Sequence, residues 1–200
     1  MTKEFDAKEK LENEREMNSY LILLRGINVG GKNKITMARL KILLEDLGFS
    51  NVSTYIASGN VFLESNKSAD EIKTQIEKTL PISFQLDSEL IKVLVLTPKQ
   101  LKDVVENKPK EFGNEPKKYR YDVLFIMPPL TPTKAMAAVE LKEGVDEAWA
   151  GRYAIYFRRL EAKVTSSRVS KIVGKPEYKS MTLRNWNTTI KLLEIMKNQK

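Results

Sequence analysis

The chain has no cysteine and no histidine among its 200 residues. A Ser-His-Asp triad, a cysteine nucleophile, an imidazole proton shuttle and a Cys/His zinc site are therefore excluded. Disulfides are excluded as well, which agrees with a reducing compartment. Any catalysis would depend on carboxylates, lysine, tyrosine, hydroxyl groups or an acquired metal, so the sequence leaves open whether the chain is an enzyme.

Long apolar runs are also missing. No run approaches the roughly 18 residues that suggest a membrane span, and residues 1–17 are too charged to contain the apolar stretch of a secretory signal. Apolar residues make up 42% of the chain and charged residues 30%, which is typical of a globular protein. We therefore expect a cytoplasmic protein with no membrane contact.

The net charge of +8 is unevenly distributed along the chain. Residues 151–200 contain twelve Lys or Arg against three acids, a net +9, whereas residues 1–17 contain four against six, a net −2. A basic segment of this size attracts phosphates, nucleotides, RNA or acidic proteins. A solvated basic surface without a specific partner would have the same composition, so both interpretations stay open.

Apolar runs and capping residues in the first half predict a β-α-β-β-α-β unit, the split arrangement of a ferredoxin-like fold. Thr36 and Ser68 are the expected N-caps of its two helices, Ser68 in a capping box with Glu71. Gly48 and Pro81 are the expected helix ends. Strands are expected at residues 20–24, 52–56, 61–63 and 90–96.

The second half repeats this pattern after a helix that begins near Thr97. It predicts a strand at 121–127, a helix from Thr131, a hairpin at 145–157 and a last helix capped by Thr182, with no evident closing strand. The fold class is therefore predicted as α+β, with two ferredoxin-like lobes, the second incomplete, packed together. The expected domains are an N-terminal extension (1–17), a first lobe (18–97), a helix and linker (98–118) and a second lobe with a C-terminal helix (119–200).

A glycine-rich loop between the first strand and the first helix is the leading candidate site. Its glycines let backbone amides approach a ligand closely, and its lysines add positive charge. Gly26, Gly31 and Lys32 have the spacing of a P-loop, but Asn33 replaces the Ser or Thr that binds magnesium. A long turn that needs glycine conformations is the structural alternative. The candidate ligand residues of this loop are Arg25, Gly26, Asn28, Gly30, Gly31, Lys32, Asn33 and Lys34.

Two further segments carry polar residues at expected element ends. Ser58 and Asn60 flank a glycine in a predicted hairpin, where they would either bind a ligand or form the turn. Arg184, Asn185 and Asn187 lie at the expected start of the last helix, where backbone N–H groups and a planar cation lie close together. Trp186 between them is expected to be a core residue.

These motifs together resemble one known family. The run Leu23 to Gly31, Tyr55 with Ser58-Gly59-Asn60, and Arg184-Asn185-Trp186-Asn187-Thr188 are similar to those of the domain-of-unknown-function 1697 family of bacterial proteins. The resemblance extends over about residues 18–196. It implies an architecture of paired ferredoxin-like lobes, and it implies no activity, substrate or cofactor.

Four functions are considered. The leading hypothesis is the binding of a small anionic ligand, phosphate- or nucleotide-containing, at the glycine-rich loop and the Arg-Asn-Trp-Asn motif. RNA binding by the basic C-terminal region is the second, although Tyr20 and Phe62 do not make the aromatic motif of RNA-binding sheets. An enzyme that uses Lys32 or a carboxylate is the third, with Asp122 expected to be exposed on a sheet edge. An interaction module is the fourth. No metal site is predicted, and the cofactor and oligomeric state are unknown.

Overall fold

The computed structural model describes residues 16–28, 30–86 and 91–199 and divides into two units, with the boundary between Pro98 and Lys99. The predicted N-terminal extension therefore lies almost wholly outside the described residues. Each unit contains one four-stranded antiparallel sheet together with helices. The α+β class is confirmed.

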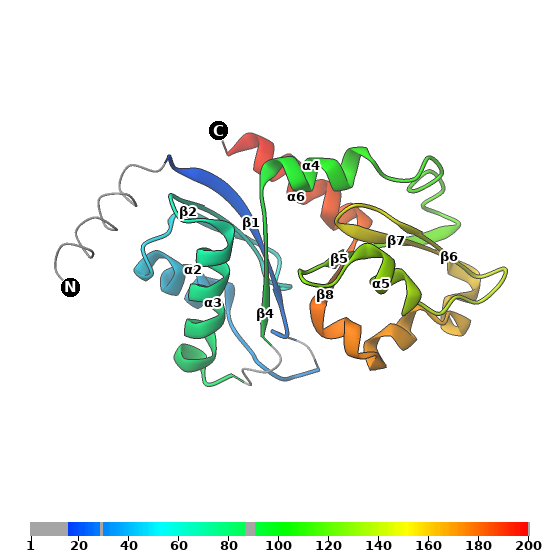
Figure 1. Ribbon diagram of the computed structural model, residues 1–200, viewed down its shortest axis with the longest axis horizontal. Helices are drawn as coiled ribbons and strands as arrows, with labels where there is room; N and C mark the ends of the chain where they lie inside the picture. Colours follow the sequence, from blue (N-terminus) through cyan, green and yellow to red (C-terminus); the bar gives the residue numbers. More distant parts are fainter. Residues whose placement is uncertain (1–15, 29, 87–90, 200) are drawn as a thin grey trace. The chain divides into compact units, whose positions relative to one another are not determined.

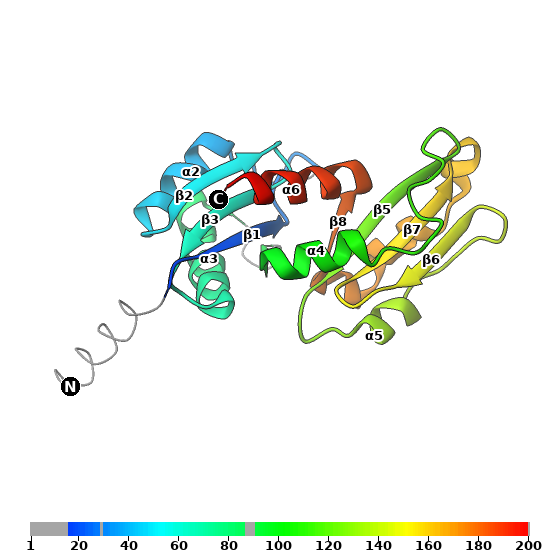
Figure 2. The ribbon, with the colours of Figure 1, turned by 90° about the horizontal axis from the view of Figure 1, so that it is seen from above.

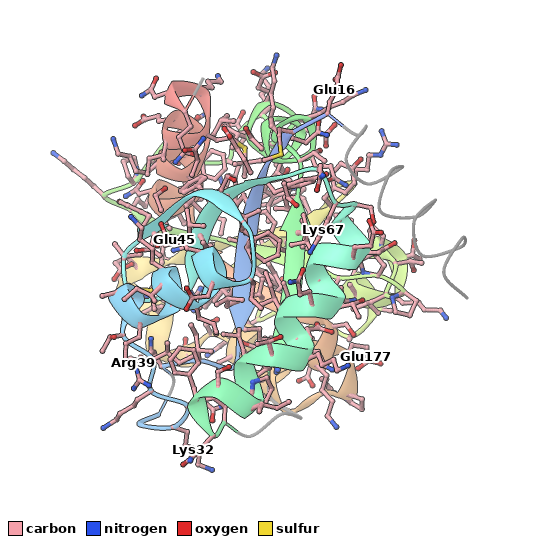
Figure 3. All side chains as sticks on the ribbon, turned by 90° about the vertical axis from the view of Figure 1, so that its left-hand side faces the viewer. Glu16, Lys32, Arg39, Glu45, Lys67 and Glu177 are labelled. Carbon is pink, nitrogen blue, oxygen red and sulfur yellow. The ribbon has the colours of Figure 1, made fainter. Side chains whose placement is uncertain are left out.

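Unit 1 is a sheet with two helices on one of its faces (Figures 1 and 3). The strand order is β2-β3-β1-β4, and all neighbours are antiparallel. The predicted strand start at Leu90 lies outside the described residues. The elements of unit 1 are β1 (Asn18–Arg25), α2 (Met37–Asp46), β2 (Ser50–Tyr55), β3 (Asn60–Ser65), α3 (Ala69–Phe84) and β4 (Lys92–Leu96).

The core of unit 1 forms where alternate residues of the central strands meet the apolar sides of α2 and α3. Ile22 of β1 is fully buried, and it shares one cluster with Leu40 of α2 and Ile76 of α3. Successive strand residues point to opposite faces, so every second residue of β1 belongs to this cluster. Burying each such side chain stabilises the fold by about 1.5–3 kcal/mol.

Both predicted N-caps of unit 1 are confirmed. The Thr36 hydroxyl accepts a hydrogen bond from the Arg39 amide at 3.4 Å, and Ser68 forms the capping box with Glu71. The predicted end of α3 at Pro81 is wrong, because the helix continues to Phe84. Proline removes one hydrogen-bond donor from the last turn of α3. The turn is kept in place because the Phe84 side chain packs against the core of unit 1.

Unit 2 has the same strand arrangement, with the order β6-β7-β5-β8. Three 3-10 segments stand between β7 and β8, and the predicted cap of α5, Thr131, is confirmed by a hydrogen bond from the Lys134 amide. The elements are α4 (Pro98–Glu106), β5 (Tyr119–Ile126), α5 (Pro132–Ala137), β6 (Asp146–Ala150), β7 (Ala154–Leu160), η1 (Glu161–Ser166), η2 (Val169–Gly174), η3 (Pro176–Ser180), β8 (Met181–Asn185) and α6 (Trp186–Asn198).

The expectation that the second half has no closing strand is wrong. β8 pairs with β5 from Asp122↔Asn185 to Ile126↔Met181 and then leads directly into α6 (Figure 2). The predicted helix cap at Thr182 is therefore wrong, because Thr182 lies in a strand and α6 begins at Trp186 with Asn185 as its cap. The strand has only five residues and no apolar run, so its sequence resembles a helix start.

The expectation that Asp122 is exposed on a sheet edge is also wrong. Strand β5 lies between β7 and β8 and is therefore central in its sheet, and Asp122 is only 3% exposed. Its carboxylate forms an ion pair with Arg159 of β7 and lies 3.8 Å from Nε of Arg120. The acid is thus a buried ion-pair partner inside unit 2.

The stretch 107–118, for which we expected a linker, lies within unit 2 and contributes to its core. Phe112 is fully buried and makes edge-on ring contacts with four aromatic residues at centroid distances of 5.0–6.3 Å. Each such contact adds about 0.5–1.5 kcal/mol beyond burial. The aromatic cluster, as we call it below, consists of Phe112, Tyr121, Trp149, Tyr156 and Trp186.

Candidate functional site

A cavity of about 340 Å³ lies in unit 2 beside the aromatic cluster. Its wall combines a loop, the first residues of β5, the residue after β7, the last residue of β8 and the first turn of α6. This volume falls at the lower end of the range for small-ligand sites. The lining residues are Gly113, Pro116, Tyr119, Arg120, Tyr121, Glu161, Asn185, Trp186, Asn187 and Ile190.

The start of α6 forms the polar side of the cavity. Asn185 caps the helix through Oδ1, which accepts a hydrogen bond from the Asn187 amide at 3.0 Å, while Nδ2 donates to the Tyr121 carbonyl. The first turn of α6 contains no acidic residue. The positive end of the helix dipole is therefore not offset by a carboxylate of its own turn, and it favours an anion in the cavity.

The aromatic side of the cavity is rigidly packed. Trp186 is buried against Phe112 at 5.1 Å between ring centroids, and a Cβ added at Gly113 would lie 2.7 Å from Nε1 of Trp186. Only glycine therefore lets the loop approach the indole this closely, all the more because Gly113 has φ +88. Tyr119 is at the border of this cluster: its ring meets that of Tyr121 edge-on at 6.2 Å, and the residue is partly exposed.

The cavity wall contains both a positively and a negatively charged side chain. Arg120 and Glu161 both line the cavity, and both are exposed to solvent. Glu161 lies beside Tyr119 because its amide donates to the Lys118 carbonyl at 2.9 Å, which extends the β5–β7 pairing by one step. The wall thus offers a cation, a carboxylate, amide groups and aromatic rings to a ligand of mixed character.

The first two sequence motifs come together at one end of unit 1. Asn28 Nδ2 donates to the Ile35 and Ala57 carbonyls at 2.9 and 3.0 Å, and Asn28 Oδ1 accepts from the Ile35 amide. Asn33 Nδ2 donates to the Gly26 carbonyl at 2.7 Å. These hydrogen bonds hold the glycine-rich loop closed and tie it to the 56–59 turn. A ligand role for the two amides stays a prediction, as does one for Arg25, Gly30 and Gly31.

The cations of this loop are directed to solvent. Lys32 and Lys34 are exposed, and Figure 3 shows Lys32 at the same end of unit 1 as Arg39 in the first turn of α2. In the neighbouring turn, Asn60 is buried and its amide donates to the Tyr55 carbonyl and to the exposed Ser58 hydroxyl. The predicted residues of unit 1 therefore share one region of that unit.

Arg184 does not line the cavity that Asn185 and Asn187 help to form. It is 7% exposed, and Nη1 donates to the Thr182 hydroxyl at 2.9 Å and to the Leu183 carbonyl at 2.8 Å. Burial, which disfavours the charged form, lowers the pKa of Arg184 to about 10. A role for Arg184 as an anion clamp stays a prediction.

Four of the twelve Lys and Arg residues of 151–200 are paired with acids from elsewhere in unit 2. Arg158 contacts Glu147 and Arg159 contacts Asp122, while Glu140 lies 3.0 Å from both Lys171 and Lys175. The two lysines lower the pKa of Glu140 through hydrogen bonds and charge. The net charge of this segment therefore overstates the charge that a nucleic acid would meet.

No helix among the described residues has the length and apolar character to cross a membrane. In the same part of the chain, no group of three or more acidic side chains is arranged to hold a metal ion. Tyr20 and Phe62, the aromatics considered for RNA stacking, are both buried.

Of the ten lining residues, the sequence predicted only Asn185 and Asn187 as ligand residues. The residues that were missed include Gly113, Tyr119, Arg120 and Glu161. The run Tyr119-Arg120-Tyr121, in which a cation alternates with aromatic rings at a strand start, was the signal that could have indicated them. Glu161 has no comparable signal, because only the strand pairing brings it beside Tyr119.

Comparisons with known proteins give a family and a structural relative. The family model described as "Protein of unknown function (DUF1697)" matches residues 17–156, which include Tyr119 and Arg120 but not Asn185 or Asn187. The structure of a conserved bacterial protein from Streptococcus pneumoniae is similar, with a TM-score of 0.75 and 28% sequence identity over 90% of this chain and 99% of that one. A comparison with curated proteins found no match.

Proposed function

We propose that this chain, which belongs to the DUF1697 family of proteins of unknown function, binds a small anionic ligand in the cavity of unit 2. The ligand contains a phosphate group or is a nucleotide. The main observation behind the proposal is that Asn187, the first turn of α6 and Arg120 all line the same cavity. A concave site with a few convergent polar groups is the usual form of a small-ligand site.

The anion binds at the start of α6. Backbone N–H groups of a helix start and the dipole of the helix both favour negative charge there. Asn187 is exposed at the second position of the helix, so its side-chain amide is available to donate to the ligand. Arg120 adds a cation from the neighbouring strand.

The glycine-rich loop of unit 1 is a second anion-attracting element of the proposal. Lys32 and Lys34 supply exposed charge there, and positive φ at Gly30 and Gly31 gives the loop its form. We treat it separately from the cavity, because Lys32→Ala with Lys34→Ala tests it without a change in unit 2. Lower affinity for the same anion in this double variant would support a role for the loop.

We also propose that the two units are two copies of one ferredoxin-like lobe. Two facts support it. Each sheet has the same relative strand order, and the order of elements β1-α2-β2-β3-α3-β4 is matched by β5-α5-β6-β7-β8 with 3-10 segments in place of the second helix. The predicted lobes at 18–97 and 119–200 correspond to the two copies.

Calorimetric titration of the full chain with ribose 5-phosphate at low salt tests anion binding. Asn187→Asp places a carboxylate at the helix start, where it also favours the helix, so the fold is retained. We expect the affinity to fall at least tenfold, about 1.4 kcal/mol. Asn198→Asp makes the same change in charge in the last turn of the same helix and should leave the affinity within about twofold.

Equal affinity in the wild type and in Asn187→Asp would contradict the proposed location. No heat and no shift in melting temperature with any phosphate compound would contradict anion binding itself.

A further inference from the structure

We infer that the ligand is a mononucleotide whose base stacks on the ring of Tyr119, an inference that rests on the proposed anion site in the same cavity. The proposed function requires only an anion. The further claim concerns the uncharged part of the ligand, and it depends on how Tyr119 is held.

Tyr119 is an aromatic platform supported from within unit 2. The Arg158 guanidinium lies 4.5 Å from the centroid of its ring, and the ring of Tyr121 meets it edge-on at 6.2 Å. Arg158 is itself fixed, because Nη2 donates to both carboxylate oxygens of Glu147 at 2.6 and 2.7 Å and the guanidinium lies over Trp149. A ring held by such contacts loses little freedom when a ligand stacks on it.

One of the two cations over the Tyr119 ring is exposed to solvent. The ammonium of Lys118 lies 4.9 Å from the ring centroid, yet the Lys118 side chain is 54% exposed. A cation that is so exposed is held weakly and is easily displaced. A flat aromatic group can therefore replace it on the ring, and the freed lysine then lies near an anionic ligand.

The edge of β5 beside this ring is not covered by β8. In the described chain the pairing of β5 with β8 begins at Asp122↔Asn185, so Tyr119 to Tyr121 precede it. The uncovered stretch lies in the cavity wall. Two of its backbone groups are already bonded, because the Tyr119 amide donates to the Glu115 carbonyl at 3.0 Å and the Tyr121 carbonyl accepts from Nδ2 of Asn185 at 3.2 Å. A nucleobase carries a π-face on each side, which matches the ring of Tyr119, and donors and acceptors along its edges, which match the polar side chains of the wall.

Size and charge favour a mononucleotide over a strand or a long phosphate chain. The cavity of about 340 Å³ is at the small end for ligand sites. The Glu161 carboxylate in the same wall repels additional phosphates, whereas one phosphate can be directed to Asn187.

The test compares three probes on the full chain: adenosine monophosphate, ribose 5-phosphate, which lacks the base, and adenosine, which lacks the phosphate. For the wild type we expect adenosine monophosphate to bind at least about tenfold more tightly than ribose 5-phosphate, since base–aromatic stacking has effects of this order. Adenosine should bind more weakly than adenosine monophosphate.

Variants of Tyr119 locate the base. Tyr119→Leu should abolish the advantage of adenosine monophosphate and leave the affinity for ribose 5-phosphate unchanged, which also shows that the cavity is intact. Tyr119→Phe keeps the ring and should retain the advantage. Tyr153→Leu, which removes a partly exposed tyrosine outside the cavity wall, should behave as the wild type.

The outcomes separate the two claims. Equal affinities of adenosine monophosphate and ribose 5-phosphate in the wild type would overturn the nucleotide inference and leave anion binding in place. Binding of adenosine alone, or of no probe, would overturn the proposed function. A tetranucleotide that binds more than about tenfold tighter than adenosine monophosphate would overturn the mononucleotide in favour of a nucleic-acid strand.

Discussion

The Tyr156 hydroxyl donates a 2.7 Å hydrogen bond to the carbonyl of Val104, inside unit 2. Val104 lies in the last turn of α4, where carbonyls have no partner within the helix. The tyrosine of β7 therefore caps the end of α4 and connects the helix to the sheet. Tyr156→Phe should lower the free energy of unfolding by about 1–3 kcal/mol, because it leaves a buried carbonyl unsatisfied. Urea unfolding measures the loss.

The same tyrosine predicts an alkaline loss of stability. Burial, and next the charge of Asp103, raises the pKa of Tyr156 to about 12 from its usual 10.0. The unfolded chain then releases this proton at a lower pH than the folded chain, so the contribution is complete below pH 10 and is lost as the pH rises towards 12. The difference in stability between the wild type and Tyr156→Phe should shrink over this range. A constant difference would contradict the assignment.

Asn28 should stabilise the glycine-rich loop both by its backbone conformation and by its side chain. It has φ +52 and three side-chain hydrogen bonds. Asn28→Gly keeps the conformation and loses the bonds, whereas Asn28→Ala loses both. We expect Asn28→Ala to be the more destabilising of the two by about 1 kcal/mol in thermal or urea unfolding. The reverse order would show that the positive φ is not what the position requires.

Asn185 should affect both stability and binding. Its side chain caps α6, so Asn185→Ala should cost about 0.5–2 kcal/mol. Asn185→Asp keeps the cap but loses the hydrogen bond from Nδ2 to the Tyr121 carbonyl, so it should cost about 1–3 kcal/mol in urea unfolding. Its carboxylate in the cavity wall should also weaken anion binding at least fivefold. An Asn185→Asp variant with wild-type affinity for ribose 5-phosphate would place the anion away from the helix start.

The Asp122–Arg159 pair should be a major electrostatic contribution to the stability of unit 2. Both side chains are largely buried, so removal of one partner leaves an uncompensated charge. Asp122→Asn should destabilise the protein by about 3 kcal/mol or more in urea unfolding. Glu194→Gln breaks an exposed pair with Lys191 and serves as the control, with an expected change below about 1 kcal/mol. Similar values for both variants would contradict this distinction between the pairs.

The features of the fold that the sequence predicted are local ones. The caps at Thr36, Ser68 and Thr131 depend on a side chain and an amide three residues away, so the chain itself contains the whole interaction. Most strands of unit 1 were predicted for a similar reason, because their apolar runs are long enough to stand out.

The errors concern contacts between distant segments. Strand β8 exists because it pairs with β5, about sixty residues earlier, and nothing in its alternation of Thr182 and Arg184 signals a strand. Asp122 was expected to be exposed because its partner, Arg159, lies on another strand. Pairing of β5 with β7 likewise brings Glu161 beside Tyr119, which is why no local motif indicated the cavity.

The central claim, that the cavity of unit 2 binds a mononucleotide, is tested most directly by amide NMR spectra of the full chain during titration with adenosine monophosphate. We predict saturable shifts of the Asn187 and Tyr119 amides and of the Trp186 indole, with the glycine-rich loop of unit 1 shifting less. Shifts confined to residues 26–35, or no saturable shift at Asn187, would contradict it.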